Sequence, residues 1–118
     1  MFKFRGKRVI DNEIVCGFHC ERGGKDFILV EQKDSAVLWF EIDPSTLGVS
    51  WGMKDKDVDV FTGDTLEDCC GYKGVVVFSI ERSEFCLQVG DNLHPIIQGD
   101  YYKLIGNIHD NPEIIEEE

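Results

Sequence analysis

The sequence predicts a mainly β fold: a single small domain in which a twisted antiparallel sheet curls into an open barrel or sandwich, with one or two short helical turns. Short apolar runs recur along the chain, Gly and Asp turns separate them, and helical periodicity is scarce. The 118 residues, 42% of them hydrophobic, suffice for one core and are too few for two independent ones. We therefore expect one domain at residues 1–115 and a solvated acidic tail at 116–118.

In the first half, apolar residues alternate with basic ones from Phe2 to Val9, which is typical of a half-exposed strand. Ile14–Cys20 and Asp26–Glu31 are two further strands, and the Gly23-Gly24 pair between them indicates a hairpin because glycine accepts positive φ. Ala36–Ile42 is the next apolar strand.

Asp43-Pro44 predicts a short helical turn, since Asp caps helix starts and Pro suits the first helical position. Gly48 is expected to end this turn in a left-handed conformation. Val58–Phe61 is expected to return as a short strand.

In the second half, Val75–Ile80 and Phe85–Val89 predict a hairpin, and the near-continuous apolar run of its first strand indicates a central position. Gly90–Asp100 is expected to be a loop and Tyr101–Ile108 the last strand. Asn111-Pro112 then indicates a short closing helical turn.

The charge balance disfavours a nucleic-acid binder. Twelve Lys and Arg stand against 23 Asp and Glu, which gives a net charge of −11, whereas affinity for a phosphate backbone comes mainly from Lys and Arg. Fully apolar runs of about four residues are far below the ~20 that a membrane span needs. The opening MFKFRGKRVIDNE has no apolar region of the secretory type, so we expect a cytoplasmic protein.

The five cysteines are an odd number without a disulfide-scaffold spacing, which agrees with a reducing compartment. The alternative is a zinc site formed by Cys16, His19 and Cys20 together with Cys69 and Cys70. Structural zinc sites usually take ligand pairs two to four residues apart in both halves of the site, whereas Cys69 and Cys70 are adjacent. On one strand, Cys16 and Cys20 would share a face, as two thiols packed in a core also would. We expect core packing, without metal or disulfide.

No catalytic constellation is recognisable. His19, His94 and His109 have no local nucleophile signature. Asp55, Asp57 and Asp59 alternate and would gather on one strand face, but a calcium loop starting at Asp55 would need Gly and Glu where Val60 and Leu66 stand. The sequence therefore predicts no catalytic, cofactor-binding or metal-binding residues, no cofactor, and no enzyme activity.

Three runs follow a family pattern: the opening Lys3-Phe4-Arg5, then IDPSTLGVSWGMKDKDVDVFTGD at 42–64, and LIGNIHDNPEII at 104–115. In these residues and their order the chain resembles the YopX protein family, small proteins of bacteriophages and prophage-like regions. It departs from the pattern at Trp51, where Thr is usual, and in a 57–63 stretch that is one residue short. The motif residues singled out are Gly52, Lys54, Asp55, Gly63, Asp64, Gly106, Asn107, Asn111 and Pro112.

The resemblance implies a mainly β fold and a bacterial host cytoplasm, but no reaction, because the family has no established activity. Turns and caps account for the motif residues: the glycines supply positive φ or close packing, and Asp64 and Asn107 bind local amides.

Three functions follow. The first is a non-catalytic accessory protein that acts through protein–protein contacts or homo-oligomerisation. Its surface would use the aromatic residues Trp39, Phe40, Trp51, Tyr101 and Tyr102, for which core filling is the plainer explanation. The alternatives are an acidic decoy of a DNA-binding protein and, less favoured, a nucleic-acid-binding module using the basic residues Lys3, Arg5, Lys7 and Arg8. A small-molecule ligand is left open.

The C-terminal run is expected to close the domain. Ile105 and Ile108 would face opposite ways on a regular strand, so Gly106-Asn107 suggests a bulge that re-aims the chain. We expect the run to dock against the N-terminal half.

Overall fold

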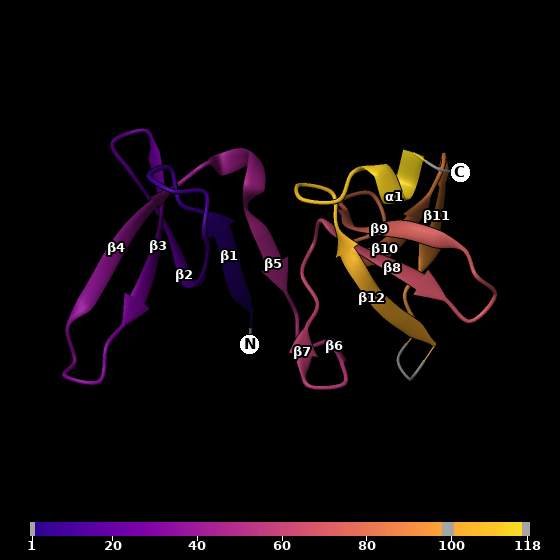
Figure 1. Ribbon diagram of the computed structural model, residues 1–118, viewed down its shortest axis with the longest axis horizontal. Helices are drawn as coiled ribbons and strands as arrows, with labels where there is room; N and C mark the ends of the chain where they lie inside the picture. The colour runs from indigo at the N-terminus through magenta and orange to yellow at the C-terminus, as the bar shows by residue number, and fades with distance from the viewer. Residues whose placement is uncertain (1, 98–100, 117–118) are drawn as a thin grey trace. The chain divides into compact units, whose positions relative to one another are not determined.

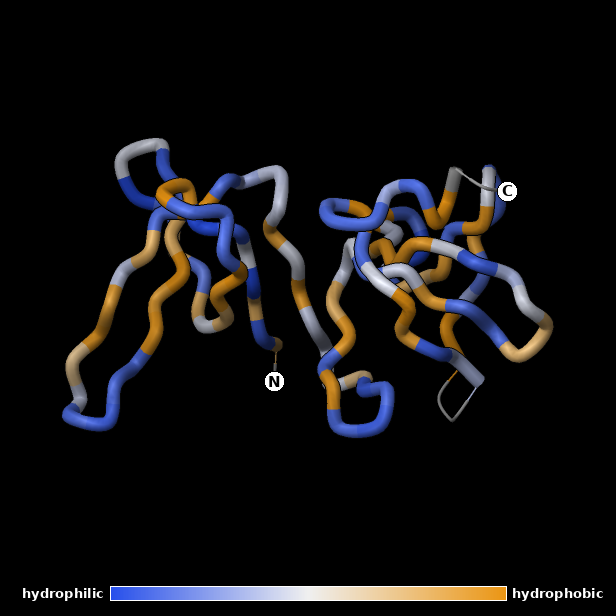
Figure 2. The backbone as a smooth tube through the Cα atoms, in the orientation of Figure 1, coloured by the Kyte–Doolittle hydropathy of each residue, from blue (hydrophilic) through white to orange (hydrophobic). Residues whose placement is uncertain are grey.

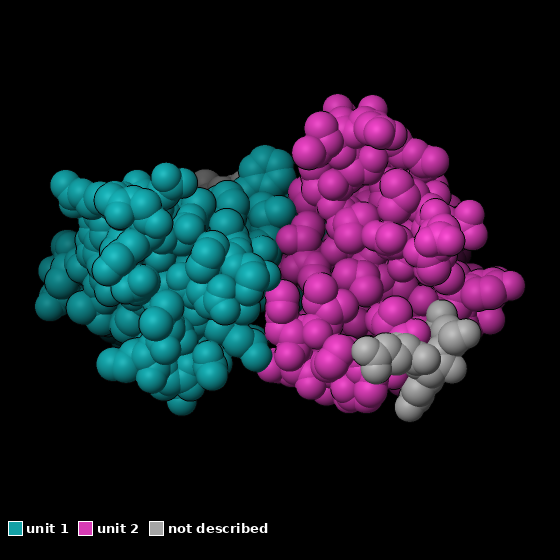
Figure 3. Space-filling view, turned by 90° about the horizontal axis from the view of Figure 1, so that it is seen from above, with its two compact units in different colours: residues 1–51 teal, residues 52–118 magenta. Residues whose placement is uncertain are grey.

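The computed structural model describes residues 2–97 and 101–116 and is mainly β (Figure 1). The chain forms two compact units, unit 1 at Met1–Trp51 and unit 2 at Gly52–Glu118, which Figure 3 colours separately. Each unit contains one five-stranded antiparallel sheet, and neither sheet closes into a barrel. The predicted mainly β fold with short helical turns is therefore confirmed. That residues 1–115 behave as one domain stays a prediction.

The sheet of unit 1 has the strand order β4-β3-β2-β1-β5. Its strands are β1 (Lys3–Lys7), β2 (Ile14–Arg22), β3 (Lys25–Glu31), β4 (Val37–Ile42) and β5 (Gly48–Ser50). The hairpin between β2 and β3 turns at Gly23 and Gly24, whose φ values of +61° and +77° are those that glycine accepts without strain. β4 lies at one edge of the sheet, so β3 is its strand partner among the described residues.

The core of unit 1 is small and depends on close approach at two glycines. Ile28 and Ile42 are 0% and 1% exposed. A Cβ on Gly6 would collide with Ile42 Cδ1, and a Cβ on Gly17 would collide with the Leu29 carbonyl oxygen. Glycine is therefore needed in the middle of β1 and of β2, where it otherwise weakens a strand.

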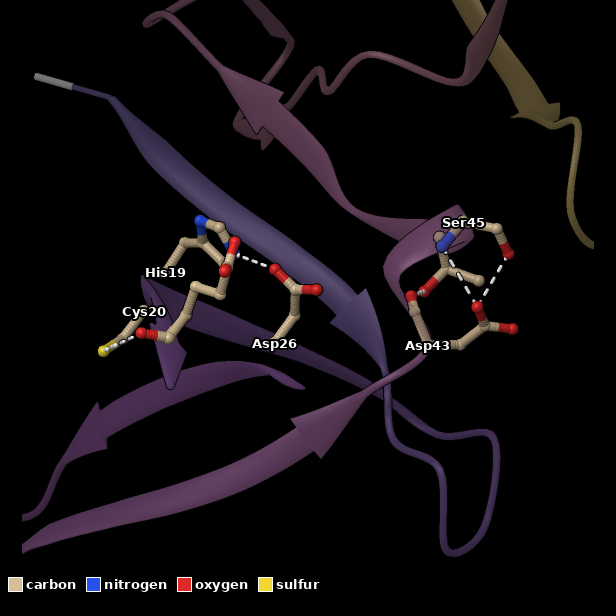
Figure 4. A network of polar contacts seen from close by, with 7 residues as sticks. His19, Cys20, Asp26, Asp43 and Ser45 are labelled. Atoms are coloured by element: carbon tan, nitrogen blue, oxygen red, sulfur yellow. Dashed lines mark hydrogen bonds and ion pairs between the residues drawn. The ribbon is translucent and has the colours of Figure 1, made fainter. Parts of the chain in front are cut away.

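A single turn of 3-10 helix, η1 (Pro44–Thr46), connects β4 to β5. Asp43 Oδ1 accepts hydrogen bonds from the Ser45 amide at 3.0 Å and the Ser45 hydroxyl at 2.8 Å, which confirms the predicted cap (Figure 4). Thr46 Oγ1 accepts from the Lys7 amide at 2.8 Å and so fixes the turn to the end of β1. The prediction for Gly48 was wrong: Leu47 ends the turn in an extended conformation, and buried Gly48 starts β5.

Unit 2 has the sheet order β11-β10-β9-β8-β12 and a separate hairpin of β6 with β7. Its elements are β6 (Lys54–Asp55), β7 (Val58–Asp59), β8 (Asp64–Asp68), β9 (Lys73–Ser79), β10 (Glu84–Val89), β11 (Asn92–Pro95), β12 (Tyr102–Asn107) and α1 (Glu113–Glu116). β9 is the central strand, as its apolar run predicted. Leu66, Val76 and Leu87, each at most 2% exposed, form the core beneath β8, β9 and β10.

Three strands of unit 2 were not predicted, of which β6 is the two-residue partner of β7. β8 carries three acidic residues in five, and it forms because β9 and β12 pair with it on both sides and Leu66 is buried between them. β11 lies within the stretch expected to be a loop, of which 98–100 lie outside the described residues. Its Pro95 is tolerated because β11 is an edge strand.

The three alternating aspartates do not share a strand face. Asp55 belongs to β6, Asp59 belongs to β7, and Asp57 lies in the turn between them, next to Lys56 at a φ of +51°. The tail predicted at 116–118 begins with the last residue of α1, and 117 and 118 lie outside the described residues.

We predict that Gly6→Ala destabilises the protein by about 1–3 kcal/mol, the usual cost of an overpacked core. The added methyl group would occupy the space of Ile42 Cδ1. Ile42→Val removes that atom, so Gly6→Ala combined with Ile42→Val should be more stable than the sum of the two single changes predicts. Urea denaturation of the four proteins measures the coupling. Strict additivity would contradict the packing described for unit 1.

Candidate functional site

The family-motif residues of unit 2 meet around one strand, β12. Asp64, 2% exposed, accepts a hydrogen bond from the Phe61 amide on Oδ2 at 2.7 Å and so closes the turn at Gly63. Asn107 pairs with Asp64 across the two strands, and the Gly63 carbonyl oxygen accepts from the Ile108 amide at 2.9 Å. Two motifs more than 40 residues apart are thereby joined through their backbones.

A β-bulge interrupts β12, as predicted. Leu104 pairs with Leu66 and Gly106 pairs with Thr65, so Ile105 is the extra residue. The Leu104 amide donates to Asp55 Oδ2 at 2.9 Å, which brings the β6 motif to the same place. Gly106 has a φ of +156°, and a Cβ there would lie 2.7 Å from Asn111 Oδ1.

The turn after β12 is held by its own side chains. Asn107 Oδ1 accepts from the His109 amide at 3.0 Å and from the Asp110 amide at 2.9 Å, and Asn111 Oδ1 accepts from the Asn107 amide at 3.4 Å. α1 follows Pro112, as predicted, and packs against β9. Because β12 pairs with β8 and α1 contacts β9, the expected docking of this run against the N-terminal half was wrong. Ile108 is 37% exposed, so the bulge does not carry it into the core.

The remaining motif residues are also in structural positions. Gly52 has a φ of +101° and Gly63 a φ of +90°, which glycine alone adopts readily. Lys54 lies 4.0 Å from Asp59 across the β6–β7 hairpin. The motif residues thus form a network that holds turns and the bulge, here called the β12 junction, and none of the contacts described for it is catalytic in form.

The thiols do not form the predicted core cluster. Only Cys86 is buried; Cys16, Cys69 and Cys70 are exposed, and Cys20 is half-buried. Cys16 and Cys20 do share one face of β2, as predicted. Within residues 2–97 and 101–116, no three His, Cys, Asp or Glu side chains gather closely enough to hold a metal ion.

The three histidines lie in different surroundings. His19 Nε2 lies 2.6 Å from Asp26 Oδ1 across the β2–β3 hairpin (Figure 4). The His19 ring also lies against the Phe4 ring, with the centroids 5.7 Å apart. His94 lies on the edge strand β11, and His109 lies beside Gly63 in the β12 junction. His19 and Asp26 form a base and an orienting carboxylate, but no Ser or Cys is within hydrogen-bond distance of His19 among the contacts described.

One face of the unit 1 sheet presents a row of apolar side chains. Phe18 pairs with Leu29 and Leu29 pairs with Trp39, so the three residues lie side by side on one face of β2, β3 and β4. Phe27 and Val37 share this face by strand alternation, and the Phe27 ring packs edge-on against Trp39 at 5.6 Å. We call these five residues the Trp39 face. Phe18, Val37 and Trp39 are 58%, 47% and 43% exposed.

The Trp39 face ends at the edge strand β4. The outer edge of β4 is bonded at its C-terminal end, where the Glu41 carbonyl oxygen accepts from the Val9 amide at 3.0 Å and Arg8 pairs with Ile42. Along residues 37–39 no described strand pairs with this edge. Figure 2 shows that β3 and β4 are hydrophobic along much of their length, with a hydrophilic turn between them. β4 exposes Val37, Leu38 and Trp39 in succession, so both faces of this part of β4 present apolar side chains. Of the five aromatic residues named from the sequence, Trp39 and Tyr101 are exposed, so core filling does not account for these two; Phe40, Trp51 and Tyr102 are half-buried.

Unit 2 contains a pocket of about 530 Å³, here called the Tyr72 pocket. Strands from both edges of the sheet line it: His94 comes from β11 and Tyr102 from β12, while Leu87 comes from β10. Asp68 and Tyr72, at the two ends of the β8–β9 turn, also line it.

Charge is divided unequally between the units. Unit 1 has seven Lys and Arg against eight Asp and Glu, so its net charge is −1; unit 2 has five against fifteen, so its net charge is −10. Lys3, Arg5 and Lys7 alternate along one face of β1, and the Arg8 guanidinium lies over the Phe40 ring at 4.6 Å.

The comparison with known families agrees with these structural features. The model of the family described as YopX protein matches residues 3–116, and the chain therefore belongs to the YopX family. The match covers both units and every residue of the β12 junction. No curated protein matches the chain. Across the described residues, no helix is long and apolar enough to cross a membrane.

Sequence reasoning missed two features of these surfaces. It predicted a strand at Ala36–Ile42 but gave that strand no place in the sheet, and a run that is apolar on both faces fits an edge strand that binds a partner. It gave no role to Asp68 and Tyr72, whose relation depends on the unpredicted strand β8.

We predict that Cys86 is the slowest of the five thiols to react with iodoacetamide. It is 0% exposed, and burial together with the Glu84 charge raises the pKa of its thiol. A hydrogen bond with Cys69 and the Cys69 charge raise the pKa of Cys70, so alkylation of Cys70 should accelerate as the pH rises through that pKa. Peptide mass spectrometry measures both; rapid alkylation of Cys86 in the folded protein would contradict the structure.

Proposed function

We propose that this YopX-family protein is a non-catalytic, phage- or prophage-derived accessory protein of the bacterial cytoplasm, and that it acts through protein–protein contact, first with a second copy of itself. The observation that carries the proposal is the Trp39 face with its open β4 edge. In the monomer, Phe18, Val37 and Trp39 lie on one face of the sheet and are about half exposed to water, which is unfavourable for apolar side chains. Full burial of one such side chain contributes about 1.5–3 kcal/mol to the free energy of association.

A second copy suits this surface better than an arbitrary partner for two reasons. Unit 1 has a net charge of −1, so two copies of its sheet approach each other with little electrostatic repulsion. Two copies of unit 2, each with a net charge of −10, would repel each other strongly. An antiparallel edge strand can also pair with itself about a two-fold axis. Such pairing would join two sheets through the part of the β4 edge, residues 37–39, that Arg8 and Val9 leave open.

Sedimentation velocity over the micromolar range tests self-association. We predict a dimer for the wild type, and for Trp39→Lys and Val37→Lys a dissociation constant raised by about tenfold or more, because a lysine on the edge strand opposes strand addition. Ile80→Lys is the matched control: Ile80 is 86% exposed in unit 2, and its replacement adds the same charge. Circular dichroism confirms that each variant folds.

A monomeric wild type through this range would overturn the proposal. So would an Ile80→Lys variant that loses the dimer as completely as Trp39→Lys does.

The charge of unit 2 favours a second candidate function, an acidic decoy that occupies a DNA-binding protein. Fifteen acidic residues in one compact unit offer a surface of the same sign as a phosphate backbone. If this is the function, tagged protein should capture basic proteins from a nuclease-treated bacterial lysate, and added duplex DNA should release them. Captured proteins that DNA does not displace would contradict it.

A further inference from the structure

We propose that the Tyr72 pocket binds the side chain of an arginine presented by an extended, basic peptide segment. The inference does not depend on self-association through unit 1, because every residue that carries it belongs to unit 2.

The pocket is a built cavity with an apolar floor. Its volume of about 530 Å³ lies in the range of small-ligand sites, ~300–1,000 Å³. Leu87, 2% exposed, contributes to the apolar lining, and Tyr72 and Tyr102 add two aromatic rings. The Tyr102 hydroxyl accepts a hydrogen bond from the Ile97 amide at 3.1 Å, which fixes one ring, whereas Tyr72 is 61% exposed.

Asp68 places a carboxylate at the pocket and also holds Tyr72. Its Oδ1 accepts hydrogen bonds from the Cys70 amide and the Tyr72 amide, both at 2.9 Å. Both bonds described for this side chain use Oδ1, so Oδ2 keeps its acceptor capacity for an incoming donor. The hydrogen bond from the Tyr72 amide also fixes the position of Tyr72 relative to Asp68. The carboxylate of Asp68 and the ring of Tyr72 could therefore contact the same ligand.

The sign of the site selects a cation. Among the described residues that line the pocket there is no Lys or Arg, and unit 2 has a net charge of −10, so the electrostatic field there attracts positive groups and repels anions. Among protein cations, arginine suits the lining best. Its planar guanidinium stacks on an aromatic ring, its donors match a carboxylate, and its methylene stem covers apolar surface such as Leu87.

The place of the pocket favours a peptide over a free guanidine. β11, which contributes His94, is an edge strand of the sheet. An extended segment can add its backbone to such an edge while alternate side chains point to one face, and one of these would enter the pocket.

The test uses the full-length protein and a blocked pentapeptide with one central arginine, titrated by calorimetry and NMR. The matched ligand contains citrulline, which keeps the shape of arginine and removes its charge. We predict saturable binding of the arginine peptide and binding of the citrulline peptide that is weaker by about tenfold or more.

Variants separate the contributions of the site. Asp68→Asn keeps an oxygen for the Cys70 and Tyr72 amides but removes the charge, and Tyr72→Leu removes the ring; each should weaken the arginine peptide by about tenfold. Tyr72→Phe keeps the ring and should bind like the wild type. Thermal melts check that the variants remain folded.

The proposal is overturned if the arginine peptide does not saturate at millimolar concentration, if citrulline binds as tightly, or if Asp68→Asn has no effect. Equal affinity for N-ethylguanidine and the peptide would overturn the assignment to a peptide segment.

Discussion

β12 enters the sheet of unit 2 through a bulge, and side chains from three separate parts of the sequence hold that bulge in place. Asp55 binds the Leu104 amide, Asp64 fixes the turn that presents the Gly63 carbonyl oxygen, and Asn107 and Asn111 close the loop that follows. A bulged strand loses regular ladder bonds, and each unmet buried amide costs about 1–3 kcal/mol. The arrangement of β8, β9 and α1 therefore depends on these polar contacts as well as on the apolar core.

This dependence accounts for the Gly, Asp and Asn residues that make up most of the motif residues. Asn111 lies so close to the Cα of Gly106 that a Cβ there would not fit. Asp64 is almost fully buried in a turn. The contacts of these residues hold the turns and the bulge of unit 2. The surfaces that we propose for binding, the Trp39 face and the Tyr72 pocket, consist of other residues, so our proposal assigns partner choice to residues outside the motif.

The sequence predicted the elements whose signal is local. The Gly23-Gly24 hairpin, the Asp43 cap, the central strand β9 and the bulge at Gly106 each follow from residue type and spacing, and the structure contains all four. β8 was not predicted because its three acidic residues obscure the apolar signal of Leu66 in the sequence. The strand forms because β9 and β12 pair with it on both sides. β11 was missed because its pairing with β10 outweighs the turn-forming character of its residues.

Exposure was harder to predict than strand formation. The same apolar run would be buried in the middle of a sheet and exposed at its edge, and only the strand order decides that β4 is an edge. The prediction of buried thiols was wrong for the same reason. Cys16 and Cys20 share a strand face as expected, but this face of β2 is the more exposed one. The Tyr72 pocket could not be predicted, since it requires residues of β8, β10, β11 and β12 to be brought together.

Native-state hydrogen exchange of the Leu104 amide in Asp55→Ala tests the central claim most directly. If the junction holds β12 in place, the variant loses protection at Leu104 and at neighbouring β12 amides, and its unfolding free energy falls by about 1–3 kcal/mol. Strands of unit 1 should keep their protection in the same sample. Unchanged exchange at Leu104 and an unchanged unfolding free energy would contradict the account and would return the motif residues to consideration as a binding site.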